Sequence, residues 1–260
     1  MKVVILAGGL GTRISEESHL RPKPMLEIGG QPILWHIMKY YSHFDFNDFI
    51  VCCGYRGYMI KEYFADYFLH RSDVTFDFRA GGRMEVHANV AEPWRVTLVD
   101  TGQDTNTGGR VKRIEPYIGG ETFMLTYGDG LGDVDLHALY RHHRQSGRTS
   151  TMTAVQPGGR YGVLTFDDGT GLVRGFLEKP KEDGGWINAG FMVMEPQVFD
   201  YIDDDRCSLE VDVLSRLGTE GRLEAYKHNG FWQCMDTQRD KTHLENLWSK
   251  GSPAWKVWAD

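Results

Sequence analysis

The opening of the chain restricts the fold most, because a short apolar strand runs directly into a glycine-rich turn. Lys2–Ala7 is rich in β-branched residues, and three glycines follow within four positions, Gly8, Gly9 and Gly11. This pattern is typical of a buried strand in a parallel sheet that leads into a loop. Parallel neighbours need a long crossover connection, so the opening favours an α/β fold built of βαβ units.

The first half of the chain continues this alternation of strand and helix patterns. A helix is expected to open at Pro32, since proline is favoured at the first helical position. Two later segments have helical periodicity, Gly57–Leu69 and Val111–Ile118. The strands between them are expected at Asp48–Cys53, Arg95–Val99 and Phe123–Tyr127. The alternation implies right-handed parallel units.

After about Arg148, short strand-like runs outnumber helices, which predicts mixed or antiparallel additions to the sheet. The expected strands are 149–157, 161–168, 172–180, 186–196, Leu223–Tyr226 and Phe231–Met235. The expected helices are Glu195–Ile202, Leu209–Leu217 and Thr237–Trp248. The aromatic-rich end, 250–260, is expected to pack on a surface or on a neighbouring subunit. We therefore expect a single domain over residues 1–260.

Charge and composition exclude several classes of protein. A net charge of −7 argues against nucleic-acid binding, which requires clustered cations. The first apolar run ends at Ala7, short of the ~7 to 15 residues of a signal-peptide core, and no stretch approaches the ~18 apolar residues of a membrane span. The four cysteines show no CxxC pair and no zinc spacing, which favours the reducing cytoplasm: Cys52, Cys53, Cys207 and Cys234.

The glycine turn has the outline of a phosphate cradle. Without side chains at Gly8, Gly9 and Gly11, backbone N–H groups can close on an anion. A P-loop is excluded because no GK[ST] follows, and a dinucleotide-binding GxGxxG is excluded because Ile14 replaces the third glycine. The glycines alone fit an ordinary turn equally well.

Two cations strengthen the phosphate-binding interpretation. Arg13 lies two positions after the last glycine, where its guanidinium can fork onto phosphate oxygens. Lys23 stands between Pro22 and Pro24, which fix the backbone on both sides and indicate a directed side chain. The alternative for a PKP segment is a surface cation beside two loop prolines.

The order of motifs along the chain resembles that of the sugar nucleotidyltransferase family. These motifs are LAGGLGTR, PKPM, IGGQPILWH, YGDG and EKP. Further segments, among them CCGY, RMEVH, LVDTG and WQ-x-MDT, are similar to members that use CTP and glucose 1-phosphate. The resemblance implies a Rossmann-like, GT-A-like α/β fold with a mostly parallel mixed sheet flanked by helices. It also implies Mg²⁺, a homo-oligomer such as a hexamer, a nucleotide-binding half over 1–148, and a sugar-binding and oligomerisation half over 149–260.

The resemblance assigns roles to individual residues. The expected nucleotide contacts are Leu6, Ala7, Gly8, Gly9, Leu10, Gly11, Thr12, Arg13, Lys23, Thr105, Arg110 and Gly128. Arg13, Lys23 and Asp129 are expected to be catalytic, and Asp129 and Asp236 to hold the metal. The expected sugar-phosphate contacts are Glu178, Lys179 and Asn188. The polar loop 100–110 that carries Thr105 and Arg110 offers the donors and acceptors that cytosine requires.

Several of these residues also fit ordinary structural roles. GDG is often only a turn, EKP a surface turn, and Asp133 or Asp135 a helix cap. We expect His142 and His143 to be solvated on a polar helix face, and Cys52 and Cys53 to point to opposite faces of a strand. Phe64, Tyr67 and Phe68 are expected in the core or in a subunit contact.

Two departures from the family pattern stand out, and two other functions stay open. Cys234 replaces a more usual proline beside Asp236, and the segment LEVDVLSRL replaces one that often carries tryptophan. The alternatives are a related enzyme that uses UTP, dTTP, GTP or another hexose phosphate, and an inactive protein that binds sugar nucleotides.

Overall fold

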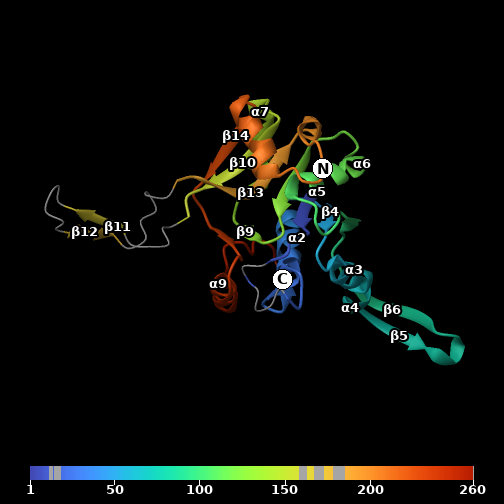
Figure 1. Ribbon diagram of the computed structural model, residues 1–260. Helices are drawn as coiled ribbons and strands as arrows, with labels where there is room; N and C mark the ends of the chain where they lie inside the picture. The colour runs from blue at the N-terminus through green and yellow to red at the C-terminus, as the bar shows by residue number, and fades with distance from the viewer. Residues whose placement is uncertain (12–13, 15–18, 158–162, 167–172, 178–184, 260) are drawn as a thin grey trace.

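The computed structural model describes residues 1–11, 14, 19–157, 163–166, 173–177 and 185–259. A seven-stranded sheet forms its centre, in the order β14-β10-β13-β8-β1-β4-β7 (Figure 1). The strands are β1 Lys2–Ala7, β4 Asp48–Cys53, β7 Arg95–Asp100, β8 Phe123–Tyr127, β10 Ser150–Val155, β13 Ile187–Met194 and β14 Leu223–His228. Strands from both halves of the chain thus share one sheet.

Six of the seven strands run in the same direction, and β13 runs against them. β1 is parallel to both β4 and β8, β4 to β7, and β10 to β14. β13 is antiparallel to both β8 and β10, so it joins the two parallel groups. The second half was predicted to add mixed or antiparallel strands to the sheet, and in the seven-stranded sheet β13 is the antiparallel strand. Because β13 runs against β8, its first residues lie near the carboxyl end of β8.

Buried side chains cover both faces of the sheet. Along β1, Val3, Ile5 and Ala7 belong to one buried cluster, while Val4 and Leu6 belong to the other, as the alternation of a strand requires. The first cluster includes residues of α2 Ile33–His43, α3 Gly57–Ala65, α7 Leu136–Ser146 and α9 Gln238–Ser249. The second includes residues of α5 Thr107–Arg113, α6 Glu115–Ile118, η4 Pro196–Tyr201, η5 Leu209–Leu214 and α8 Ser215–Thr219. The result is a helix–sheet–helix arrangement.

Three expected helices differ from the observed ones for identifiable reasons. Pro32 is the residue before α2, not its first residue, because it pairs with Glu27 in the short ladder of β2 Glu27–Ile28 and β3 Gln31–Pro32. Gly57–Leu69 is split into α3 and the short α4, Tyr67–His70. The helix expected over Val111–Ile118 begins earlier, at a cap provided by Asn106, and breaks before Pro116, which has no backbone N–H to continue it.

A β-hairpin that the sequence did not predict projects from the body beside α3 and α4 (Figure 1). It consists of β5 Ser72–Asp77 and β6 Arg83–Asn89, joined through the 3₁₀ turn η3 Phe78–Ala80. Every residue of β6 is exposed. Strand patterns are read from a buried face, and this hairpin has none to signal it. Two further ladders are short: β11 Val163–Phe166 with β12 Val173–Leu177, and β9 Gly130–Gly132 with β15 Trp232–Cys234.

The prediction that His143 is solvated is wrong. Its side chain is 1% exposed, and its ring nitrogens lie 2.8 Å from Thr151 Oγ1 and 3.1 Å from Glu195 Oε1. It shares the buried face of α7 with Leu136 and Leu139, and this face lies against the sheet. Because histidine is polar and most of this helix is polar, the sequence pattern did not indicate that His143 lies on the buried face.

Other side-chain expectations are confirmed. Cys52 and Cys53 belong to opposite buried clusters, and Asp135 caps α7 by accepting from the backbone N–H of Ala138. At the chain's end, Trp255 is fully buried in the first cluster, so this segment packs onto the body. No helix in the described part of the chain has the length and apolar content needed to cross a membrane.

Candidate functional site

A cavity of about 370 Å³ opens at the carboxyl ends of β1 and β8, where parallel sheets place their ligands. It brings together most of the residues expected to bind nucleotide or metal. Its lining is Leu6, Ala7, Gly8, Gly9, Gly11, Lys23, Pro24, Thr105, Asn106, Thr107, Arg110, Tyr127, Gly128, Asp129 and Asp236. Leu10 is half exposed and does not line it. The predicted residues Thr12, Arg13, Glu178 and Lys179 lie outside the described residues.

The glycine turn is held through the carbonyl oxygen of Gly8. The carbonyl of Gly8 accepts from the backbone N–H of Tyr55 at 3.1 Å and from the Arg110 guanidinium at 3.0 Å. A Cβ at Gly8 would lie 2.2 Å from that guanidinium, so a side chain at this position is excluded unless the guanidinium moves. At Gly128 a Cβ would lie 2.9 Å from the carbonyl oxygen of Leu6. Close approach therefore requires glycine at both positions.

Arg110 lies beneath this turn and is 4% exposed. Besides Gly8, it donates to the hydroxyl of Thr101 at 2.8 Å and to the carbonyls of Gly102 and Gln103 at 2.7 and 3.1 Å. Burial lowers the pKa of the guanidinium. Its contact with the base stays a prediction, but the contacts observed give it a second role, because it ties the glycine turn to the loop that carries Thr105.

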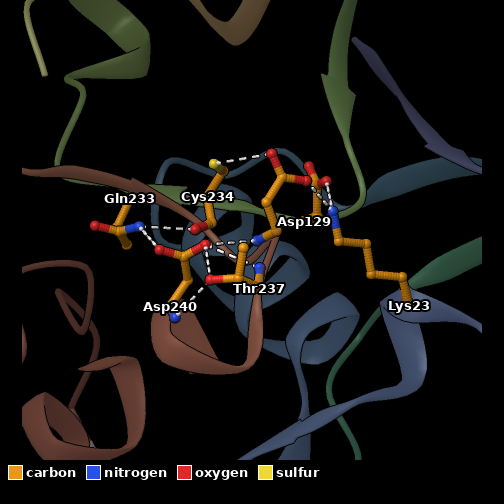
Figure 2. A network of polar contacts seen from close by, with 7 residues as sticks. Lys23, Asp129, Gln233, Cys234, Thr237 and Asp240 are labelled. Carbon is orange, nitrogen blue, oxygen red and sulfur yellow. Dashed lines mark hydrogen bonds and ion pairs between the residues drawn. The ribbon is translucent and has the colours of Figure 1, made fainter. Parts of the chain in front are cut away.

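Two carboxylates and one ammonium of the cavity lining contact one another. Figure 2 shows Lys23 beside Asp129 in this group. Lys23 Nζ lies 2.6 Å from Asp129 Oδ2 and 2.5 Å from Asp236 Oδ1. Lys23 begins a 3₁₀ turn, η2 Lys23–Met25, directly after Pro22. Burial by itself disfavours the charged amine, but the two carboxylates outweigh it, and the pKa of Lys23 is raised. The lysine is thus directed into the site, as its two prolines indicated.

Asp236 reaches Asp129 through the short β9–β15 ladder. Cys234 pairs with Gly130 there, and the backbone N–H of Met235 donates to the carbonyl of Asp129 at 2.8 Å. The thiol of Cys234 lies 3.7 Å from Asp236 Oδ2. Burial, together with the carboxylates, raises its pKa to about 12, so the replacement of proline adds a neutral thiol to this wall.

This pair of carboxylates fits a hard divalent cation. Both present oxygen to the point that the Lys23 ammonium contacts, and Mg²⁺ takes one or two carboxylates together with phosphate oxygens and water. Within the described ranges, no cluster of three or more His, Cys, Asp or Glu side chains offers a protein-only metal cage. The donor set therefore suits a metal that a triphosphate also ligates.

A polar chain that the sequence did not predict leads from the cavity to Asn188. Asn188 Nδ2 donates to the hydroxyl of Tyr127 at 3.2 Å, and that hydroxyl donates to Glu210 at 2.6 Å. The other carboxylate oxygen of Glu210 accepts from Thr107, which lines the cavity. Asn188 is thus one residue removed from the lining. The available signal was a glutamate next to the buried Leu209, since a carboxylate that is buried needs polar partners.

Residues 2–255 match the family model described as nucleotidyl transferase. The chain belongs to the nucleotidyl transferase family. It is 57% identical over 259 residues to the glucose-1-phosphate cytidylyltransferase of Salmonella typhimurium, which covers 99% of this chain and all of the relative. It is 44% identical to the probable glucose-1-phosphate cytidylyltransferase of Bacillus subtilis, with coverage of 99% and 100%. The resemblance in the motifs is confirmed.

Two solved structures confirm the architecture. The crystal structure of HddC from Yersinia pseudotuberculosis superimposes with a TM-score of 0.70 at 24% identity, over 95% of this chain and 99% of that one. UDP-glucose pyrophosphorylase in complex with UDP-glucose gives 0.68 at 17% identity, over 96% and 98%. The predicted GT-A-like fold with a mostly parallel mixed sheet is therefore correct. Nucleotidyl transferases of this family generally use a divalent metal ion.

Proposed function

We propose that this chain transfers the cytidylyl group of CTP to α-D-glucose 1-phosphate, giving CDP-glucose and pyrophosphate. The observation that carries the reaction class is the convergence of Lys23, Asp129 and Asp236 in a cavity bounded by the glycine turn. The choice of CTP and glucose rests on the 57% and 44% identical relatives, whose names specify both.

The chemistry is an in-line displacement. A phosphate oxygen of glucose 1-phosphate attacks the α-phosphorus of CTP, the bond from that phosphorus to the bridging oxygen breaks, and pyrophosphate leaves. No covalent enzyme intermediate is required, so the enzyme contributes position and charge. Backbone N–H groups of the glycine turn, with Arg13, hold the triphosphate. Lys23 keeps its proton, because its pKa is raised, and stabilises the negative charge that develops at the α-phosphate.

Asp129 and Asp236 are the proposed metal ligands. A bound Mg²⁺ supplies positive charge that neutralises the phosphate oxygens. The two carboxylates come from loops after β8 and β15, and the ladder between β9 and β15 keeps those loops in register. With the metal ion held by the two carboxylates, Lys23 is the side-chain cation that we assign to the α-phosphate.

The sugar side of the proposal rests on fewer described residues. Asn188 begins the polar chain through Tyr127 and is proposed to contact the hexose, with Glu178 and Lys179 holding hydroxyl and phosphate groups. We assign nucleotide binding mainly to 1–148, and sugar binding and subunit association to 149–260. We also propose that the protein is a cytoplasmic homo-oligomer, such as a hexamer, whose product serves deoxysugar and surface-polysaccharide synthesis.

A nucleotide panel tests this function. The protein is incubated with Mg²⁺, glucose 1-phosphate and, in separate reactions, CTP, UTP, dTTP or GTP, and pyrophosphate release is measured. We expect CTP to give at least about tenfold higher kcat/KM than any other triphosphate, an energetic difference of roughly 1.4 kcal/mol. Preference for another base would replace CTP in the proposal. Binding of CDP-glucose with no turnover for any triphosphate would favour an inactive sugar-nucleotide-binding protein.

A further inference from the structure

The segment that carries Asp236 is tied to one carboxylate that does not touch the cavity. Asp240, in the first turn of α9, accepts at Oδ2 from the backbone N–H of Asp236 at 3.2 Å. The same oxygen accepts from the backbone N–H and the hydroxyl of Thr237, at 2.9 and 2.8 Å. Oδ1 accepts from Gln233 Nε2 at 3.2 Å. Figure 2 shows these contacts on the side of the segment away from Lys23.

Only part of this network is needed to begin the helix. Thr237 is the N-cap of α9 and forms a capping box with Asp240, which satisfies the free N–H groups of the first turn. The bond from Asp236 lies outside that box, because Asp236 precedes the cap. The bond from Gln233 also lies outside it, and it reaches back into β15.

The extra bonds fix Asp236 from both sides along the chain. Gln233 Nε2 donates at once to Asp240 and to the carbonyl of Cys234, at 3.2 and 2.8 Å, so the end of β15 is linked to the start of α9. Asp236 lies in the short connection between these two elements. Its backbone is therefore held at residues before it, at its own N–H and at the residue after it.

We infer that Asp240 is a positioning residue, which acts through Asp236 to hold the second metal-binding carboxylate opposite Asp129. This inference rests on the proposed metal-dependent transfer. Partners of metal ligands typically change metal affinity or activity by about 10- to 100-fold when they are removed. We assign the effect of Asp240 to its hydrogen bond with the backbone N–H of Asp236, and not to a bond with the Asp236 carboxylate.

The test is a calorimetric titration of Mn²⁺ into the full chain with CTP present and sugar phosphate absent, so that no turnover occurs. Asp240→Ala is compared with Asp135→Ala, which removes the carboxylate that accepts from a backbone N–H in the first turn of α7. We expect Asp240→Ala to weaken Mn²⁺ binding by about 10-fold or more, and Asp135→Ala to leave it within about twofold. Asp240→Asn keeps one acceptor oxygen and serves if the alanine variant does not fold, with an expected loss that exceeds that of Asp135→Ala.

The outcomes separate this inference from the proposed function. Wild-type affinity in Asp240→Ala, or an equal loss in Asp240→Ala and Asp135→Ala, would overturn the positioning role. If the wild-type protein itself binds no Mn²⁺ with CTP, the proposed metal site fails instead. With glucose 1-phosphate added, the positioning role also predicts that high Mn²⁺ restores kcat in Asp240→Ala, because the ligand is displaced and not lost. A kcat that stays low at saturating Mn²⁺ would contradict it.

Discussion

At the scale of single residues, the site combines two carboxylates with one ammonium group. The sequence predicted the direction of Lys23 from its two prolines, and the resemblance assigned Asp129 and Asp236 as ligands. Spacing alone could not have grouped them, because the contacts of Lys23 join residues 106 and 213 positions apart. Glu210 and Asp240 were missed for a related reason, since their partners are backbone groups and side chains that only the folded chain brings near.

A second residue-scale feature is a histidine that burial keeps neutral. His36 in α2 is fully buried, with Nε2 2.8 Å from the carbonyl of Ile28 and Nδ1 3.5 Å from Trp255 Nε1. A neutral ring that donates from Nε2 and accepts at Nδ1 satisfies both contacts. Burial lowers its pKa to about 4, from an ordinary value of 6.5.

This histidine predicts a loss of stability in mild acid. The unfolded chain takes up the proton near pH 6.5 and the folded chain only near pH 4. The stability of the folded chain is therefore unaffected by this histidine above pH 6.5, and it decreases as the pH falls from 6.5 to 4. The loss amounts to roughly 3 kcal/mol at pH 4. Urea unfolding from pH 7 to 4 should show a flatter pH dependence for His36→Gln than for wild type. His87→Gln, on the exposed hairpin, should match wild type, and equal slopes in all three proteins would refute the assignment.

At the scale of elements, buried strands were predicted well and exposed or interrupted elements poorly. Lys2–Ala7, Asp48–Cys53 and Phe123–Tyr127 have the bounds expected, because a strand buried on both faces has a continuous apolar run. The exposed hairpin of β5 and β6 has no such run. Apolar periodicity does not record the break before Pro116 or the short β9, whereas β15 lies within the expected strand Phe231–Met235.

The glycine turn makes an element-scale prediction about close packing. Gly8→Ala forces a methyl group against the Arg110 guanidinium, so the turn or the arginine must shift, at a cost of about 1–3 kcal/mol. Gly9→Ala is the matched control, because nothing lies within 4 Å of a Cβ there. Thermal unfolding should show a clear decrease in midpoint for Gly8→Ala and little change for Gly9→Ala. Equal stability of the two variants would show that Arg110 does not confine the turn.

At the scale of the whole molecule, the two ends of the chain build one site. Lys23 follows the first strand, Asp129 follows β8, and Asp236 comes from the last connection before α9. The short β9–β15 ladder brings the C-terminal part back to the carboxyl edge of the parallel sheet. The sequence indicated an α/β fold, but the return of the chain to this edge was known only through the family resemblance.

Lys23, Asp129 and Asp236 are proposed to form one reaction centre. Steady-state pyrophosphate release with CTP and glucose 1-phosphate, together with calorimetric CTP affinity, tests this for wild type and Lys23→Ala. Lys227→Ala, an exposed lysine on β14, serves as the control. We predict that Lys23→Ala lowers kcat by about 10² or more while CTP affinity changes by less than about tenfold. An unchanged kcat in Lys23→Ala would contradict the account.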